Sequence, residues 1–322
     1  MLYFTVFGFA IFAILALFVL LTYNDIIGRL GSSQRKDAVA VAPGVTVAPW
    51  VTINEEKAFP MGLTAGPNGT LYLSIFGTGA IHRLNSDGSL SFVKGLTAPG
   101  AIAAGPDGTL YVIDYTGVDM RAYGQLKRIS PAGEVSLFGD ALNATYLPLL
   151  SGLAVDRVGN VYVTHADSAS VWRVTPSGLA EVWWRIPELG AAKALPTGLG
   201  YDAQGDALLV TDAATGTLYR VPLAAMQPVG EVLYRQKDFD LRGVTLDDTQ
   251  RPLLISWKNE NGALHRLEAE GTLTLLAERF RAPTAIVYHE GKAVVVNSGA
   301  PGIISQIRTD PPFTVDVVTL PQ

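Results

Sequence analysis

Three side chains in this 322-residue sequence have types and neighbours suited to acid–base chemistry. His165 is followed two residues later by Asp167, and a His–Asp pair can act as a general base. Asp114 and Asp212 carry carboxylates that can supply an acid or help to hold a cation. We name His165, Asp114 and Asp212 as the candidate catalytic residues. The alternative is a structural role, in which each Asp belongs to a repeat and ties down the loop that follows it.

A second group of residues is suited to binding a ligand. A cation at Arg242 beside the indole of Trp257 would suit a carboxylate or a planar molecule. An ion pair between Arg242 and Asp240 is the simpler interpretation of the same residues. The candidate ligand-binding residues are Ser151, Thr197, Arg242, Trp257 and Asn297.

Composition excludes several other classes of chemistry. The chain has no cysteine, so it forms no disulfide, thiolate metal site or cysteine nucleophile. It also lacks a G-x-S-x-G nucleophile motif, a phosphate loop and a dinucleotide fingerprint. A net charge of -5 argues against binding to nucleic acid. With 48% hydrophobic residues and 16% charged residues, the chain is not intrinsically disordered.

An internal sequence repeat predicts where these candidate residues lie in the fold. Each copy starts with a Gly and a short apolar segment, followed by a Gly-containing turn and an aliphatic–aromatic run, as in GLTAGPNGTLYLS. Two more strand-like runs follow in each copy, the first usually containing an Arg. The copies recur every 38–52 residues and begin at Gly62, Gly100, Gly152, Gly198, Gly243 and, in degraded form, Thr284. Six units of four short strands predict an all-β fold, a six-bladed β-propeller over residues 61–322.

Loop lengths predict which face of the propeller carries function. The connections after the second and fourth strand of a blade lie on one face, and here they are the longer ones. Long loops on a rigid scaffold usually carry binding residues, so we expect the site at the channel mouth on this face. The residues expected just before the innermost strands are Met61, Pro99, Ser151, Thr197, Arg242 and Pro283. Those expected at the ends of the second strands are Ile75, Asp114, His165, Asp212, Trp257 and Asn297.

The repeated phrases resemble NHL repeats and the six-bladed propellers of the gluconolactonase, senescence-marker protein and strictosidine-synthase-like superfamily. The resemblance covers residues 62–322 and concerns the fold more closely than the function. Gluconolactonase-like relatives hold a divalent cation at the channel with Glu, Asn and Asp side chains, mostly just before innermost strands. At those places this sequence has Met61, Ser151 and Thr197, which are weak cation ligands. We therefore expect no cofactor, with calcium as the exception if Asp114, Asp212 and Asn297 rebuilt the site.

The N-terminus predicts a membrane anchor. Residues 2–22 contain no charged side chain, and a helix of this length spans roughly 30 Å of hydrocarbon. A cleaved signal peptide is the alternative, but no basic residue precedes the apolar run and no A-x-A site follows it. We expect an anchor helix over residues 1–23 and a tether over 24–60 that contains an edge strand near 45–53.

The two signals for membrane orientation disagree. Arg29, Arg35 and Lys36 follow the apolar run, so the positive-inside rule keeps the propeller in the cytoplasm. Resemblance to membrane-anchored strictosidine-synthase-like proteins favours the extracytoplasmic side, and we adopt that expectation for a single-pass membrane protein.

Two functional hypotheses follow from the sequence. The first is a binding or scaffolding module that takes a protein partner or small ligand at the long-loop face, and the second is a hydrolase of lactones or esters. The first is preferred because the expected mouth has few catalytic groups and the fold itself does not decide function. A periplasmic assembly factor or a subunit of a larger membrane complex is a third hypothesis, with the binding surface on the blade sides or near the anchor.

Overall fold

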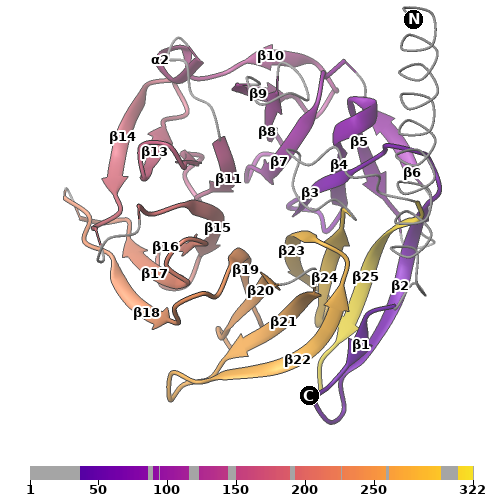
Figure 1. Cartoon of the computed structure of the whole chain (residues 1–322). Helices are drawn as coiled ribbons and strands as arrows, with labels where there is room; N and C mark the ends of the chain where they lie inside the picture. The colour runs from indigo at the N-terminus through magenta and orange to yellow at the C-terminus, as the bar shows by residue number, and fades with distance from the viewer. Residues whose placement is uncertain are drawn as a thin grey trace, which may run out of the picture. The chain divides into compact units, whose positions relative to one another are not determined.

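The computed structural model describes residues 37–321 apart from 86–89, 94, 116–122, 144–149, 189–192, 226, 259–260 and 299–310. Residues Ala38–Gln322 form one compact unit made of six antiparallel sheets arranged around a centre (Figure 1). The prediction of an all-β, six-bladed propeller with four-stranded blades is confirmed. The expected anchor helix, residues 1–23, lies outside the described residues.

The first three blades take their strands in chain order. Blade 1 comprises β3 (Pro60–Ala65), β4 (Leu71–Ile75), β5 (Ala80–Leu84) and β6 (Leu90–Val93), with the short 3-10 helix η1 (Phe76–Thr78) after β4. Blade 2 comprises β7 (Pro99–Ala104), β8 (Leu110–Tyr115), β9 (Gly124–Ile129) and β10 (Val135–Leu137), followed by α2 (Asp140–Asn143). Blade 3 comprises β11 (Leu150–Val155), β12 (Val161–His165), β13 (Ser170–Val174) and β14 (Ala180–Arg185).

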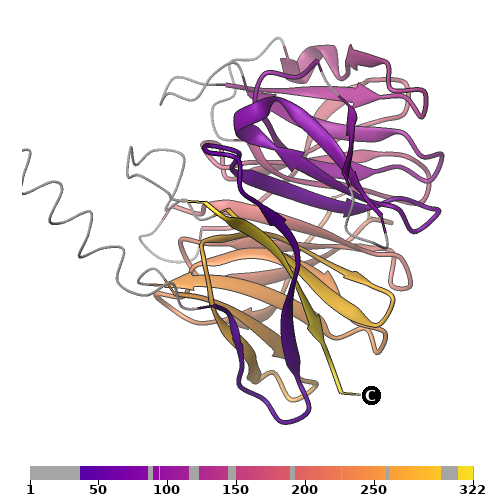
Figure 2. The same cartoon turned by 90° about the vertical axis from the view of Figure 1, so that its right-hand side faces the viewer.

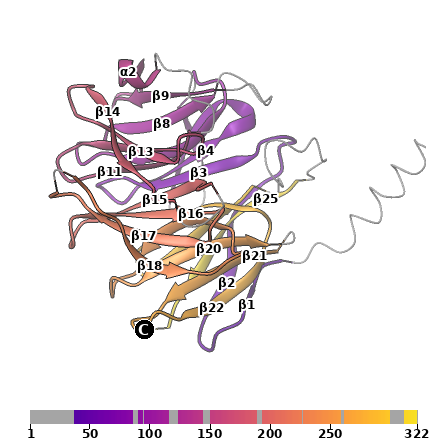
Figure 3. The same cartoon turned by 60° about the vertical axis from the view of Figure 1, so that its left-hand side comes forward.

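Blade 4 is also built in chain order, whereas blades 5 and 6 each include a strand from the N-terminal part of the chain. Blade 4 comprises β15 (Pro196–Asp202), β16 (Ala207–Asp212), β17 (Thr217–Pro222) and β18 (Glu231–Arg235), which lie side by side in chain order (Figure 3). Blade 5 comprises β19 (Leu241–Leu246), β20 (Pro252–Lys258), β21 (Asn261–Leu267) and β22 (Leu273–Phe280), with β1 (Val39–Ala40) added at its edge. Blade 6 comprises β23 (Pro283–His289), β24 (Lys292–Asn297), β25 (Phe313–Thr319) and, from the other end of the chain, β2 (Thr46–Ile53).

Strand β2 closes the ring by joining the two ends of the propeller. It runs antiparallel to β25, from Thr46 opposite Thr319 to Ile53 opposite Phe313 (Figure 2). Pro49 lies at a register shift on this outermost strand, and proline within a sheet is typical of edge strands and bulges because it has no N–H to donate. The edge strand expected near residues 45–53 is therefore the fourth strand of blade 6.

The core lies between neighbouring sheets. Between blades 2 and 3, for example, the side chains of Ile113, Leu126, Leu150 and Val163 are at most 1% exposed. Such packing explains the near-continuous apolar second strand of each repeat, because its two faces both touch another blade.

Glycine near the start of an innermost strand allows blades to approach closely. A Cβ at Gly152 would lie 2.7 Å from the carbonyl oxygen of Thr197 in the next blade. A Cβ at Gly198 would lie 2.8 Å from the carbonyl oxygen of Arg242. A Cβ atom is not tolerated this close to a carbonyl oxygen. The close approach of neighbouring blades therefore explains why the repeated sequence phrase opens with Gly.

Helices are few in the part of the chain that the structure describes. None of them is long and apolar enough to cross a membrane. The apolar segment 2–22 lies outside this part, so its role as an anchor stays a prediction.

Candidate functional site

The mouth is defined by one residue from each innermost strand, at the face that carries the long loops. Each such residue follows the first residue of the strand and lies at a register shift between the two inner strands. We call this set the mouth ring: Met61, Gly100, Ser151, Thr197, Arg242 and Thr284.

The register corrects two of the positions expected before the innermost strands and one of those expected at the ends of the second strands. Ser256, rather than Trp257, pairs with Leu241 at the start of its innermost strand, and Trp257 lies one residue further along β20. Pro99 pairs with Asp114 and Pro283 pairs with Asn297, so both prolines lie one residue before the ring position. Gly100 and Thr284 occupy that position instead. The corresponding residue in blade 1 is Pro60, which pairs with Ile75. The prolines are therefore buried residues at the start of the innermost strand. The sequence spacing alone did not distinguish this position from the mouth-ring position one residue later.

Ser151 and Thr197 use their hydroxyl groups to join blades. Ser151 Oγ donates to the carbonyl oxygen of Pro196 in blade 4 at 2.9 Å. Thr197 Oγ1 donates to the carbonyl oxygen of Leu241 in blade 5 at 2.7 Å. Both hydroxyls are therefore committed to the contacts between innermost strands, and they do not present free donors at the mouth.

A second row of hydroxyl groups, absent from our sequence predictions, supports the ring from the second strands. Thr164 Oγ1 accepts the N–H of Gly152 at 2.6 Å, and Thr211 Oγ1 accepts the N–H of Gly198 at 2.8 Å. Ser74 Oγ does the same in blade 1. The signal was present in the sequence as a Ser or Thr one residue before the end of the second strand.

Asp212 is fully buried and holds the backbone of its own blade. Its carboxylate accepts the N–H of Leu195 at 2.8 Å and the N–H of Ala214 at 3.0 Å. It also accepts the hydroxyl of Thr215 at 2.6 Å. These donors fix both the segment that enters the innermost strand and the turn after the second strand, so the carboxylate is engaged by the scaffold.

Asp114 has the equivalent place in blade 2. Its carboxylate accepts the N–H groups of Thr97 at 3.0 Å and Ala98 at 2.8 Å, and it pairs with Lys127 Nζ at 2.6 Å. The side chain is 2% exposed. The contact goes to the segment before the innermost strand, whereas the sequence interpretation placed it on the loop that follows.

Asn297 repeats the arrangement in blade 6. Its Oδ1 accepts the N–H of Arg281 at 3.1 Å, and its Nδ2 donates to Asp316 Oδ2 at 2.7 Å. The amide is buried and bridges two neighbouring strands to the entering segment. Three blades thus use one buried polar side chain for the same structural task.

His165 ends the second strand of blade 3 and is 4% exposed. Its Nδ1 lies 2.5 Å from Ser168 Oγ, which lies 2.6 Å from Ser170 Oγ. Blade 4 contains the same chain of contacts, formed there by Asp212, Thr215 and Thr217. The contact of His165 with a serine therefore follows from the turn architecture of the repeat.

The expected partner of His165 forms an ion pair with another side chain. Asp167 is 62% exposed and forms an ion pair with Lys193 Nζ at 3.1 Å. The predicted catalytic residues Asp114, His165 and Asp212 end the second strands of three successive blades, and the contacts described for each go to groups of its own blade.

Arg242 is the one charged member of the mouth ring. Its Nη2 donates to Asp240 Oδ2 at 2.6 Å, and its guanidinium carbon lies 5.5 Å from the centre of the Trp257 ring. Trp257 also donates its backbone N–H to the carbonyl oxygen of Asp240 at 2.9 Å. The side chains of Arg242 and Asp240 are 35% and 30% exposed. Burial raises the pKa of the Asp240 carboxyl, and the Arg242 guanidinium opposes that shift.

The residues at the mouth do not fit the divalent cation that the superfamily resemblance implies. In the part of the chain that the structure describes, no group of three or more His, Asp or Glu side chains is arranged to hold a metal. Ser151 and Thr197 stand where ligands are expected, but their hydroxyl groups donate to backbone carbonyls. Hard cations require several converging oxygen ligands, which these residues do not supply.

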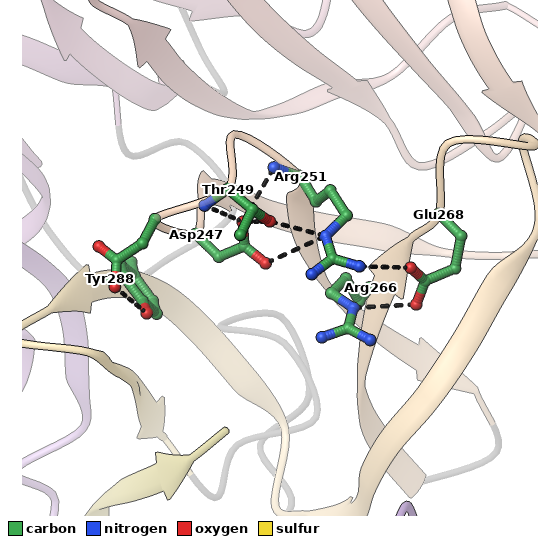
Figure 4. Close-up of polar contacts among 7 residues, drawn as sticks. Asp247, Thr249, Arg251, Arg266, Glu268 and Tyr288 are labelled. Atoms are coloured by element: carbon green, nitrogen blue, oxygen red, sulfur yellow. Dashed lines mark hydrogen bonds and ion pairs between the residues drawn. The ribbon is translucent and has the colours of Figure 1, made fainter. Parts of the chain in front are cut away.

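The opposite face carries a charged network in blade 5 that stabilises short turns (Figure 4). Asp247 accepts the N–H groups of Thr249 at 2.9 Å and Arg251 at 3.0 Å. Glu268 accepts hydrogen bonds from Arg251 Nη1 and Arg266 Nε, both at 2.9 Å. Burial would raise the pKa of Glu268, but its hydrogen bonds, among them those from both arginines, outweigh burial and lower it. Each charge in this network therefore has a partner of opposite sign.

A hollow of about 340 Å3 lies on the same short-turn face, between blades 1 and 2. Two charged side chains line it, and each makes a local contact. Asp107 accepts the N–H and hydroxyl of Thr109, while Arg83 lies over the Tyr72 ring. This hollow is therefore a weaker candidate than the mouth.

Comparison with known proteins identifies the fold. No protein-family model matches the chain, and no curated protein matches it in sequence. The structure is similar to a gluconolactonase from Xanthomonas campestris, with 12% identity and a TM-score of 0.64 over 90% of this chain and 99% of that one. It is also similar to a catalytically inactive virginiamycin B lyase from Staphylococcus aureus with quinupristin, with 14% identity and a TM-score of 0.59 over 86% and 100% of the two chains.

A third similar structure is a chain of the nidogen/laminin complex, with 20% identity and a TM-score of 0.55 over 68% of this chain and 79% of that one. The chain is thus a six-bladed propeller related in fold to gluconolactonase-like and lyase proteins. Identities this low show the fold alone.

Proposed function

We propose that this protein is a membrane-anchored binding module without catalytic activity, which takes a small ligand or protein partner at the long-loop face of the propeller. One observation carries the proposal: the polar side chains at the mouth that chemistry would need are engaged by the scaffold. Asp212 alone accepts two backbone N–H groups and a hydroxyl, and its side chain is 0% exposed. A general acid or base must instead reach the proton that it transfers.

The fold is compatible with binding as well as with catalysis. Its neighbours include a gluconolactonase and a lyase, and also a chain from a complex of two proteins, nidogen and laminin. Since propellers host unrelated functions, we base the proposal on the residues at the mouth. Of the six residues of the mouth ring, only Arg242 is charged, which favours recognition over acid–base chemistry.

The proposal includes a location. Residues 2–22 anchor the protein as a single transmembrane helix, and the propeller lies on the extracytoplasmic side. The net charge of -5 supports partners other than nucleic acid. Extraction of membranes with alkaline carbonate tests the anchor, and protease treatment of intact cells or vesicles tests the side. Recovery of the full chain in the soluble fraction would contradict the first part of this proposal.

Catalysis is tested by turnover and calcium binding. The full chain, purified in detergent, is assayed with gluconolactone and with p-nitrophenyl acetate, with and without calcium, and calcium binding is measured by titration calorimetry. We expect no turnover above buffer and no stoichiometric calcium binding. Turnover that is lost in His165→Ala and kept in His289→Ala would overturn the proposal in favour of a lactone or ester hydrolase.

A further inference from the structure

Three polar atoms at the mouth are buried and have no hydrogen-bond partner in the described structure. They are Arg242 Nε, Trp257 Nε1 and Asp240 Oδ1. A buried donor or acceptor without a partner is unfavourable and demands an explanation, such as a bound molecule. All three atoms belong to one cluster in blade 5, which we call the Arg242 cluster.

Contacts within the Arg242 cluster hold its three residues near one another. The guanidinium is paired with Asp240 through Nη2 at 2.6 Å and lies over the Trp257 ring at 5.5 Å. The backbone of Trp257 bonds that of Asp240 at 2.9 Å. The cluster therefore offers two N–H donors and one carboxylate acceptor that nothing in the described protein uses.

We propose that the Arg242 cluster binds a ligand that carries a carboxylate next to a hydroxyl or amine donor. This inference rests on the proposed function and names its ligand class. The ligand carboxylate accepts from Arg242 and from the indole N–H of Trp257, and the neighbouring hydroxyl or amine donates to Asp240. The three atoms are shielded from solvent, so the guanidinium moves when the ligand enters. Arg242 is 35% exposed and has a long, flexible side chain that permits this movement.

Charge limits the ligand to a single carboxylate rather than a phosphate dianion. Asp240 is bonded to the same guanidinium, so a second negative charge on the ligand would lie beside a carboxylate. The other members of the mouth ring are neutral: Met61, Gly100, Ser151, Thr197 and Thr284. The Trp257 ring adds an apolar surface on which the body of the ligand can pack.

Titration calorimetry on the full chain in detergent tests the ligand class with two pairs of probes. One pair is lactate and propionate, and the other is mandelate and phenylacetate; the amide of mandelate serves as the uncharged reference. We expect the hydroxy acid of each pair to bind more tightly than its partner, and the amide to bind least. Failure of every carboxylate to bind would overturn the inference.

Matched variants assign the binding to the Arg242 cluster. Arg242→Gln removes the charge at the mouth, whereas Arg173→Gln removes an equally exposed charge that is paired with Glu181 in the outer part of blade 3. We expect affinity for mandelate to fall about tenfold or more in Arg242→Gln, equivalent to ~1.4 kcal/mol, and to stay unchanged in Arg173→Gln. Arg242→Lys, which keeps the charge but loses the planar fork, should lie between them.

Two further variants test the roles of the partners. Trp257→Phe should weaken both acids of a pair, since it removes the indole donor. Asp240→Asn should reduce the preference for the hydroxy acid over its partner, because it changes the acceptor. Equal binding by the wild type and Arg242→Gln would show that the cluster is structural. That result leaves the proposed function standing, because the turnover, calcium-binding and membrane-extraction experiments test that function separately.

Discussion

His265 gives the sharpest test of the blade packing. It packs against Phe239, with ring centres 5.1 Å apart, and its Nε2 lies 2.9 Å from Ser256 Oγ. Burial lowers its pKa from 6.5 to about 4. The substitution His265→Gln keeps a hydrogen-bonding side chain toward Ser256 but removes the titrating ring.

The direction of the effect follows from this lowered pKa. Below pH 6.5 the unfolded chain takes up a proton that the folded chain binds only near pH 4. The stability that neutral His265 contributes is therefore complete above pH 6.5 and is lost as the pH falls toward 4. Between pH 7 and pH 4.5 this loss is about 2 kcal/mol, at 1.36 kcal/mol for each pKa unit.

Urea unfolding followed by tryptophan fluorescence measures this loss at the two pH values. We expect the wild type to lose about 2 kcal/mol more stability between pH 7 and pH 4.5 than His265→Gln does. Burial also lowers the pKa of His82, so the variant keeps a smaller pH dependence of the same sign. His289→Gln, in a turn on the short-turn face, serves as the control and should retain the wild-type loss. If His265→Gln and the wild type lose equal stability, the argument from burial is refuted.

Three further predictions concern the scaffold. Gly198→Ala should lower the free energy of unfolding by about 1–3 kcal/mol, because its Cβ would meet the neighbouring blade at 2.8 Å; denaturant unfolding measures this, and an unchanged midpoint would contradict close packing of the inner strands. Asp212→Ala should lower the free energy of unfolding by about 3 kcal/mol, because it leaves buried N–H groups without acceptors. Asp167→Ala, which breaks an exposed ion pair, should lower it by less than about 1 kcal/mol, and comparable losses in the two variants would be inconsistent with these roles. A chain that begins at residue 38 should unfold cooperatively on heating, whereas a chain that begins at residue 54 lacks β2 and should not. Cooperative unfolding of the shorter chain would show that blade 6 does not need its closing strand.

The number and kind of blades were predictable because they depend on local patterns. Each repeat carries its own turns, and an Asx contact such as that of Asp107 with the N–H of Thr109 needs only neighbouring residues. The ion pair between Arg242 and Asp240 was also predictable, because the two residues lie two positions apart at the start of the same innermost strand. Local sequence spacing therefore predicts both the turns of a blade and ion pairs between residues that are close in the sequence.

Long-range contacts were not predictable in the same way. The register that separates Gly100 from Pro99 depends on a shift between two strands, which similar sequence phrases do not reveal. The roles of Ser151 and Thr197 depend on carbonyl groups 44 or 45 residues away in the next blade. A hydroxyl at a channel mouth looks available in a sequence, and only the neighbouring strand shows that it is used.

Closure by β2 also determines how the propeller bears mechanical load. Any pull on the chain ahead of residue 38 reaches the propeller through β1, which has two residue pairs with β22, and then through β2. Seven residue pairs with β25 resist that force. Sufficient tension would therefore first free β1 from the edge of blade 5 and then strip β2 from blade 6, while the four-stranded sheets of blades 1 to 5 remain paired.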